Sequence, residues 1–212
     1  AIGVVQTERS DVIAPRLRSN TADRGRARAH ADLFGAWGAT YDFGREPCAQ
    51  ASEAGLRCLQ GSGSLGQLLA LNRPAALELW DDGPEPFYAV LLAADGDDYT
   101  IAIDGTETEV DTRTLQRHWF GNYTLLWQVP PGWEQTVSAG QRGPQVEWLR
   151  QRLEDASGGL VTSGDRSYFG AALERALKRY QRDHGLRPDG IAGPQTLIHL
   201  HTRSGIPVAR LD

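Results

Sequence analysis

The sequence predicts an α+β fold, with antiparallel strands in the middle of the chain and helices before and after them. Short runs of alternating, β-prone residues recur between residues 87 and 129, and turns rich in Asp and Gly join them. Apolar residues at helical spacing precede these runs, and three further short helical patterns follow residue 143. The chain has 212 residues and is 40% hydrophobic, which is enough for one or two domains with a buried core.

The first part of the chain is predicted to consist of an arm followed by a helix. Residues 1–20 show no sustained hydrophobic period, so we expect an N-terminal arm or linker there. Thr21 is a typical helix N-cap, and the helix that follows carries Leu33 and Phe34 before it ends at Gly35. This helix is expected to open a domain that spans residues 21–135.

The body of this domain is predicted to be a second helix and a sheet. Pro47 opens the helix and Gly55 ends it, because proline is tolerated in a first helical turn and glycine favours a left-handed C-terminal cap. The β-prone runs lie at residues 87–93, 99–103, 106–110 and 123–129. Together they indicate an antiparallel sheet packed on the early helices.

Two groups of side chains in this sheet region resemble binding groups, and we interpret both as structural. Three acidic residues in a turn could bind Ca²⁺, but a calcium loop would continue with Gly and Glu, so a solvated hairpin turn is favoured: Asp95, Asp97 and Asp98. Three tryptophans could line a groove for sugars or peptides, and core and interdomain packing is favoured instead: Trp119, Trp127 and Trp133. No metal and no cofactor is expected.

The two cysteines of the chain, Cys48 and Cys58, flank the helix that Pro47 opens. In an oxidising compartment they are expected to form a disulfide, which stabilises a loop of this size by about 3 kcal/mol. In a reducing compartment they remain thiols, and the pKa of Cys48 is lowered at the helix N-terminus, which suits a nucleophile. The sequence leaves both states open.

The order of features around Cys48 resembles the papain-like cysteine peptidases of the bacteriocin-processing, double-glycine type. In that family a cysteine opens a helix, further helices follow, and a strand pair supplies a histidine and then an aspartate. The resemblance places Cys48 at the position of the nucleophile, a helix at residues 65–71 and the first strand at residues 73–79. It places Asp104 at the position of the third catalytic residue.

This peptidase-like domain is predicted to be inactive. The strand that should begin with histidine begins with Phe87 and Tyr88. A thiol peptidase needs a base to form the thiolate and an acid to protonate the leaving amine, and neither residue serves both near neutral pH. His118 could be recruited as the base, but a histidine beside aromatic residues more often has a packing or surface role. If Cys48 is also bonded to Cys58, no nucleophile remains.

The residues after position 139 predict three short helices joined by tight turns. The first begins near Pro144, and the second covers about residues 170–183 and ends at Gly185. The third begins at Pro194, after the segment GLRPDGIAGPQTL. A unit of three short helices lies near the lower size limit for independent folding.

These motifs resemble the peptidoglycan-binding domain that is appended to cell-wall hydrolases and other envelope proteins. The resemblance covers a predicted domain at residues 136–212. Two positions depart from the family pattern: Leu173 replaces a usual Thr, and Asp165 begins a turn that is usually Asp-Gly. The glycines and the apolar motif residues are interpreted as turn, cap and core positions, so binding is expected from more exposed side chains. The candidates are Tyr168, Arg182, Arg187, Asp189 and Gln195.

Charge is distributed unevenly along the chain. Residues 31–139 carry 16 acidic residues and 5 Arg, whereas residues 140–212 carry 8 acidic residues and 11 Lys and Arg. The acidic middle argues against nucleic-acid binding, and the mildly basic C-terminal unit favours an anionic polymer such as peptidoglycan. No apolar run is long enough to span a bilayer, so no membrane contact is expected from this segment itself.

The tandem order of the two domains resembles the periplasmic C-terminal part of the general secretion pathway A family, in which an ATPase domain and an inner-membrane span precede this segment. The resemblance implies a non-catalytic periplasmic scaffold that helps to assemble the type II secretion outer-membrane channel through the cell wall. It implies peptidoglycan and the general secretion pathway B protein as partners, the latter at a free strand edge in residues 85–130. The alternatives are an active cell-wall-targeted cysteine peptidase that uses Cys48 and, with no zinc set or paired carboxylates to support it, a wall hydrolase.

Overall fold

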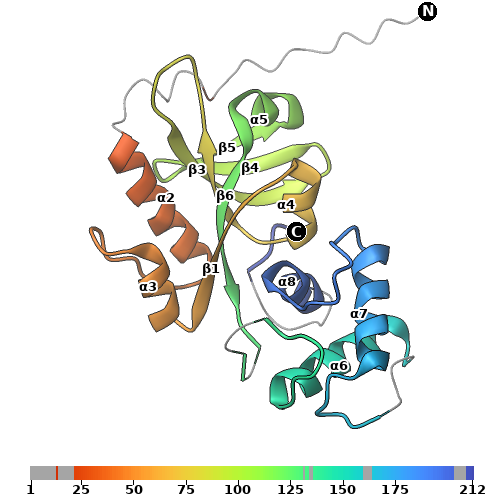
Figure 1. Ribbon diagram of the computed structural model, residues 1–212. Helices are drawn as coiled ribbons and strands as arrows, with labels where there is room; N and C mark the ends of the chain where they lie inside the picture. The colour runs from red at the N-terminus through yellow and green to blue at the C-terminus, as the bar shows by residue number, and fades with distance from the viewer. Residues whose placement is uncertain (1–12, 14–21, 131, 134–135, 160–163, 203–208) are drawn as a thin grey trace, which may run out of the picture.

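The computed structural model describes residues 13, 22–130, 132–133, 136–159, 164–202 and 209–212 (Figure 1). The predicted arm at residues 1–20 lies outside the described residues except for Ile13, and so does the predicted cap Thr21. Ile13 is buried in the core. The α+β prediction is confirmed, because helices pack on an antiparallel sheet.

Among the described residues, six strands form one antiparallel sheet in the order β1-β6-β2-β3-β4-β5. They are β1 Leu56–Ser62, β2 Ala75–Leu79, β3 Phe87–Asp95, β4 Asp98–Ile103, β5 Thr106–Asp111 and β6 Trp119–Gln128. The sequence does not predict β1, because its segment LRCLQGS has no β-branched residue and no strict alternation. Its long pairing with β6 makes it a strand.

Four helices belong to the first domain: α2 Ala22–Ala36, α3 Pro47–Glu53, α4 Leu65–Leu71 and α5 Thr112–His118. Helix α2 ends one residue beyond the predicted Gly35. Helix α4 begins with a capping box between Ser64 and Gln67, and its C-cap is Asn72, which has a left-handed conformation with φ 50°. The sequence does not predict α5, although Asp111 caps it by accepting a hydrogen bond from the Thr114 amide.

The sheet is covered on both faces (Figure 1). Helix α2 packs on the face formed by Ala76, Val90, Ala102 and Leu126. Leu77 follows Ala76 in β2, and Leu91 follows Val90 in β3. Both leucines belong to the opposite face of the sheet, which α4 and α5 cover. This alternation follows from the two-residue period of side chains in a strand.

Three helices form the C-terminal unit within its described residues: α6 Pro144–Ser157, α7 Ala171–Asp183 and α8 Pro194–Thr202. All three predicted helices are therefore present. Gly185 has the expected left-handed conformation, with φ 67°. It is part of a Schellman motif in which the Leu186 amide donates to the Gln181 carbonyl and the Gly185 amide donates to the Arg182 carbonyl.

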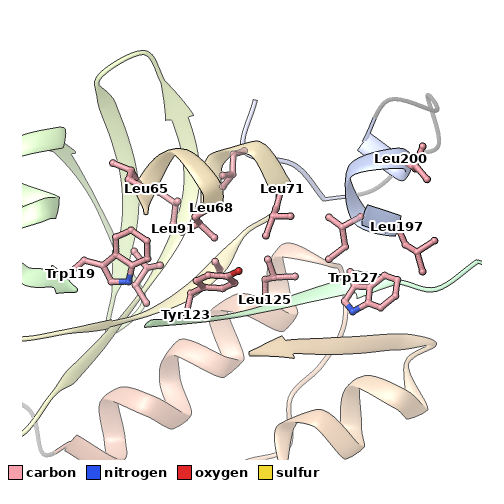
Figure 2. Close-up of a cluster of buried hydrophobic side chains, with 14 of the residues drawn as sticks. Leu65, Leu68, Leu71, Leu91, Trp119, Tyr123, Leu125, Trp127, Leu197 and Leu200 are labelled. Atoms are coloured by element: carbon pink, nitrogen blue, oxygen red, sulfur yellow. The ribbon is translucent and has the colours of Figure 1, made fainter. Parts of the chain in front are cut away.

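The two units share one hydrophobic core. Figure 2 shows α4 and the sheet beside α8, and the buried cluster joins Leu71 and Trp127 of the first domain to Leu197 of α8. Polar contacts cross the same boundary: the buried guanidinium of Arg73 donates to the Thr202 hydroxyl at 3.0 Å. The two predicted domains are thus packed against each other.

The C-terminal end of the chain returns to the first domain. The Leu211 amide donates to the Asn72 side chain at 2.8 Å, and the Leu211 carbonyl accepts from the Ala94 amide at 2.9 Å. Leu211 itself is buried in the shared core. The last described residues therefore lie between α4 and β3.

Candidate functional site

Cys48, the position of the nucleophile in the peptidase-like pattern, is the second residue of α3. Glu46 caps this helix by accepting a hydrogen bond from the Ala49 amide at 2.7 Å. The sulfur of Cys48 is bonded to that of Cys58 in β1, with 5.4 Å between the two Cα atoms. Both cysteines of the chain are used in this bond, which ties α3 to the edge of the sheet and leaves no thiol at Cys48.

A cavity of about 440 Å³ lies next to Cys48, between α2, α3 and the sheet. Tyr88 of β3 lines it together with Cys48, so the structure brings the predicted nucleophile and histidine positions to one site. The Arg26 guanidinium lies 4.7 Å from the centre of the Tyr88 ring and donates to its hydroxyl. Tyr88 is therefore held in a polar contact with α2.

His30 on α2 is a lining residue of this cavity that the sequence argument missed. Burial, followed by repulsion from Arg26, lowers its pKa, and Glu46 opposes this shift. The lowered pKa favours the neutral form of His30. The peptidase-like pattern places its histidine after Cys48, whereas His30 precedes Cys48. The helical period of α2 carries His30 to the same side as Arg26, four residues earlier.

The other two predicted positions lie away from this cavity. His118 ends α5, where its Nδ1 lies 2.7 Å from the Trp80 carbonyl, and it is buried against Phe87. Asp104 lies in the two-residue turn between β4 and β5, with φ 52°. Neither is among the described lining residues. An Asp-Gly pair suits this turn because both residues need a positive φ.

The lining of the first cavity also includes several polar groups. They include the carboxylates of Glu46 and Glu78, and Glu78 accepts hydrogen bonds from Trp80 and Asn122. With the disulfide formed, the cavity offers hydrogen-bonding groups and no thiolate. It can hold a polar ligand, but the bonded sulfur cannot attack one.

The five predicted peptidoglycan-binding residues lie at separate places on the C-terminal unit, and all are exposed. Tyr168 has the Arg142 guanidinium 4.4 Å from its ring centre, so one face of the ring is occupied. Asp189 accepts from the Gln181 side chain at 3.1 Å and from the Ile191 amide at 2.9 Å, which gives it a role in the turn. Arg182 lies near the end of α7, Arg187 in the following loop and Gln195 in the first turn of α8.

Gln181 organises the turn that carries the GLRPDGIAGPQTL motif. It is 1% exposed, its side-chain oxygen accepts from the Gly190 amide, and its side-chain nitrogen donates to the Ile191 carbonyl and the Thr196 hydroxyl. The motif residues are thus joined by a buried hydrogen-bond network.

A second cavity, of about 220 Å³, lies between α6 and α7. Its described lining includes Arg179, Asp183 and His184, and none of the five predicted binding residues. No pattern in the sequence indicates this cavity, because it depends on how the ends of two helices meet.

In the described part of the chain, no group of three or more His, Cys, Asp or Glu side chains is arranged to hold a metal ion. Asp95, Asp97 and Asp98 form the hairpin between β3 and β4. No helix within the described ranges combines the length and apolar character needed to cross a bilayer.

Two domain families match the chain. The family described as GspA, peptidase C39-like domain, matches residues 17–129, which is more than half of the chain. The chain belongs to the GspA family. A second family, described as a peptidoglycan binding domain, matches residues 142–200.

Individual GspA relatives agree with this assignment. General secretion pathway protein A of Aeromonas hydrophila is 36% identical over 186 residues, covering 87% of this chain and 33% of the relative. The counterpart in Escherichia coli K12 is 29% identical over 176 residues, covering 82% of this chain and 35% of the relative. This chain therefore spans about a third of the length of these relatives.

A solved structure supports the fold of both domains. The periplasmic domain of the EpsAB fusion protein of the Vibrio vulnificus type II secretion system aligns with a TM-score of 0.55 and 26% identity. The alignment covers 86% of this chain and 82% of that one. The chain is thus a GspA-like type II secretion protein with a peptidase-like domain and a peptidoglycan-binding domain.

Proposed function

We propose that this chain is a non-catalytic periplasmic scaffold that binds peptidoglycan and a partner protein and helps to assemble the type II secretion outer-membrane channel. The observation that carries the proposal is the packing of a peptidase-like domain, with its nucleophile position in a disulfide, against a peptidoglycan-binding unit. Such a body can connect the cell wall to another protein without cutting either.

The loss of catalysis is supported by the three positions that match catalytic residues of the peptidase-like pattern. The sulfur of Cys48 is in a disulfide, Tyr88 stands at the histidine position, and Asp104 lies in a distant turn. His30 lines the cavity, but it has no thiol to activate while the disulfide is formed. A periplasmic location agrees with this state, because that compartment favours disulfides.

The partner proposal concerns strand β5, which pairs only with β4 among the described strands. The general secretion pathway B protein is the proposed partner, and the solved relative described as an EpsAB fusion supports a close association of the two components. An unpaired strand edge can accept a partner strand through main-chain hydrogen bonds.

The wall-binding part is tested by sedimenting the full chain with purified, insoluble peptidoglycan sacculi. The full chain is the appropriate sample, because cutting at the domain boundary would expose the core that Leu71 and Leu197 share. We expect retention in the pellet at moderate salt, above that of a non-binding protein of similar charge. Recovery of all the protein in the supernatant would contradict wall binding.

The non-catalytic part is tested by thiol labelling. Without reductant, iodoacetamide should label neither cysteine of the native protein, and the mass should be lower than that of the reduced form by about two hydrogens. Labelling of native Cys48, with peptide hydrolysis that is lost in Cys48→Ala, would instead establish the active peptidase.

A further inference from the structure

The cavity between α6 and α7 has a distinct position in the C-terminal unit. Its lining comes from the last turn of α6, represented by Leu153 and Ser157, and from the second half of α7 up to His184. The cavity therefore lies where the C-terminal ends of two helices meet. Helix C-termini carry partial negative charge, which favours a cationic group in a ligand.

Two opposite charges on α7 line this cavity. Arg179 has no hydrogen bond or ion pair with the described residues, so its guanidinium is available to a carboxylate. Among the residues that the structure describes, Asp183 has a single ion pair, with Arg182 at 4.0 Å, and both side chains of that pair are more than half exposed. Such an exposed pair is weak, so Asp183 can accept from an ammonium group instead.

His184 adds a directional group to the same wall. Its Nδ1 lies 2.8 Å from the Tyr180 carbonyl, which can only accept, so Nδ1 carries the proton and donates. In the neutral ring, Nε2 is then an acceptor. Its ring also stacks against Tyr180, with 4.2 Å between ring centres, which limits its rotation.

The size and apolar lining of the cavity restrict the ligand further. Ligand pockets usually measure about 300–1,000 Å³, so about 220 Å³ accommodates the end of a peptide but not a length of glycan. The apolar lining consists of Leu153, Ala156 and Ala176, which suit a methyl-sized side chain. The cavity thus combines a carboxylate partner, an ammonium partner and a small apolar surface.

We infer that this cavity binds the free end of a peptidoglycan stem peptide, with the terminal alanyl carboxylate on Arg179 and the ammonium of the preceding diamino acid on Asp183 and His184. The inference rests on the proposed wall binding and names its subsite and ligand chemistry. It also separates this subsite from the five scattered surface residues that the sequence indicated.

The test uses the full chain and the stem tetrapeptide L-Ala-γ-D-Glu-diaminopimelate-D-Ala, titrated by NMR and compared with sacculi sedimentation. Arg179→Ala is expected to weaken tetrapeptide binding about tenfold, as loss of a charge-assisted hydrogen bond implies. Arg175→Ala is the matched control, because Arg175 is an exposed arginine one turn earlier on α7 and is not a lining residue. Circular dichroism checks that both variants fold.

A matched ligand sharpens the result. The tetrapeptide with an amidated C-terminus should bind the unmodified chain about tenfold more weakly, and should bind Arg179→Ala no more weakly than the free acid does. If Arg179→Ala and Arg175→Ala bind the free acid equally, or if the amide binds as well as the acid, the assignment of the cavity is wrong while wall binding stands. If the unmodified chain fails to sediment with sacculi and to bind the tetrapeptide, both proposals are wrong.

Discussion

Cys48 and Cys58 illustrate how a residue can keep its place in a pattern while its chemistry changes. Cys48 opens α3 as a nucleophile would, and its sulfur is nevertheless committed to β1. The disulfide joins a helix to an edge strand that has a partner on one side, so its main contribution is expected to be to stability.

The first prediction concerns this disulfide. The double variant Cys48→Ser, Cys58→Ser should lower the free energy of unfolding by about 3 kcal/mol, because the unfolded chain loses a closed loop. Urea unfolding followed by fluorescence measures this change. The unmodified chain with reductant should show a similar loss, and equal stability of the double variant and the oxidised chain would refute the prediction.

A second residue-scale prediction concerns Gln181. Gln181→Leu should destabilise the fold by about 3 kcal/mol, because the Gly190 amide and the Ile191 carbonyl lose their buried partner. Gln195→Leu, an exposed change on α8, is the control and should stay within about 0.5 kcal/mol of the parent. Thermal or urea unfolding distinguishes the two, and equal stabilities would show that the network contributes little.

Residue types alone predicted some roles and not others. The structural interpretation of the motif glycines agrees with Gly185, because its left-handed conformation follows from local rules. Asp104 matches the third catalytic residue of the peptidase-like pattern by its position in the chain. In the structure it occupies a turn position with a positive φ, which accounts for an aspartate there. The presence of His30 at the cavity could not be predicted, since it depends on how α2 crosses the sheet.

At the scale of elements, the strand edges determine where another chain can add. The turn at Asp104 and Gly105 joins β4 to β5, with Ile103 opposite Thr106. In such a hairpin the two residues that flank the turn are hydrogen-bonded to each other. Non-hydrogen-bonded and hydrogen-bonded pairs then alternate along the two strands. The main-chain groups of Glu107 and Glu109 are therefore expected to point to the free edge of β5.

The third prediction tests this edge. Glu109→Pro should abolish binding of the purified periplasmic part of the general secretion pathway B protein, because proline removes an outward amide without breaking the β4 pairing. Glu109→Ala keeps the amide and should retain binding within a few-fold. Isothermal titration calorimetry measures both, and full binding by the proline variant would rule out strand addition at β5.

The elements themselves were largely predictable where local signals mark their ends. Helices α6, α7 and α8 have Pro or Gly at their boundaries, and the strands after residue 87 have alternating patterns. Strand β1 and helix α5 lacked such signals. β1 exists because β6 supplies a partner, and a single sequence window cannot show that partner.

At the scale of the whole molecule, the two units are joined by a buried interface with charged groups in it. Arg73 is 1% exposed, and its guanidinium donates to the Leu71 and Asn72 carbonyls as well as to Thr202. Near it, His201 is 3% exposed and packs its ring against Trp148. The sequence predicted two domains and an interdomain packing role for tryptophans such as Trp127, which lies in the shared core. It did not predict the leucines of the interface, because they resemble ordinary core residues of each unit.

The fourth prediction uses the pH dependence of this interface. Burial, followed by repulsion from Arg73 and Arg152, lowers the pKa of His201 to about 4. Between pH 6.5 and 4 the unfolded chain therefore binds more protons at this position, and stability falls as pH falls. His201→Gln should remove the part of this decrease in unfolding free energy that comes from His201, which is on the order of 3 kcal/mol.

Urea unfolding at pH 7, 5.5 and 4 measures this effect in the parent and in His201→Gln. The difference between the two proteins in how steeply the unfolding free energy changes with pH isolates His201, because His30 and the carboxylates titrate in both. The variant should show a shallower decrease in unfolding free energy below pH 6.5. Parallel profiles for the two proteins would show that His201 does not titrate in the way its burial implies.

The return of Leu211 to the first domain has a mechanical consequence. The C-terminal unit is attached to the sheet at its beginning, where the chain leaves β6, and again at its end, where Leu211 bonds to Asn72 and Ala94. A force applied to this unit is therefore shared by two attachments and by the interface that holds Arg73. Moving the two units apart would therefore require breaking buried contacts as well as straightening the connecting chain, so we expect their spacing to resist tension.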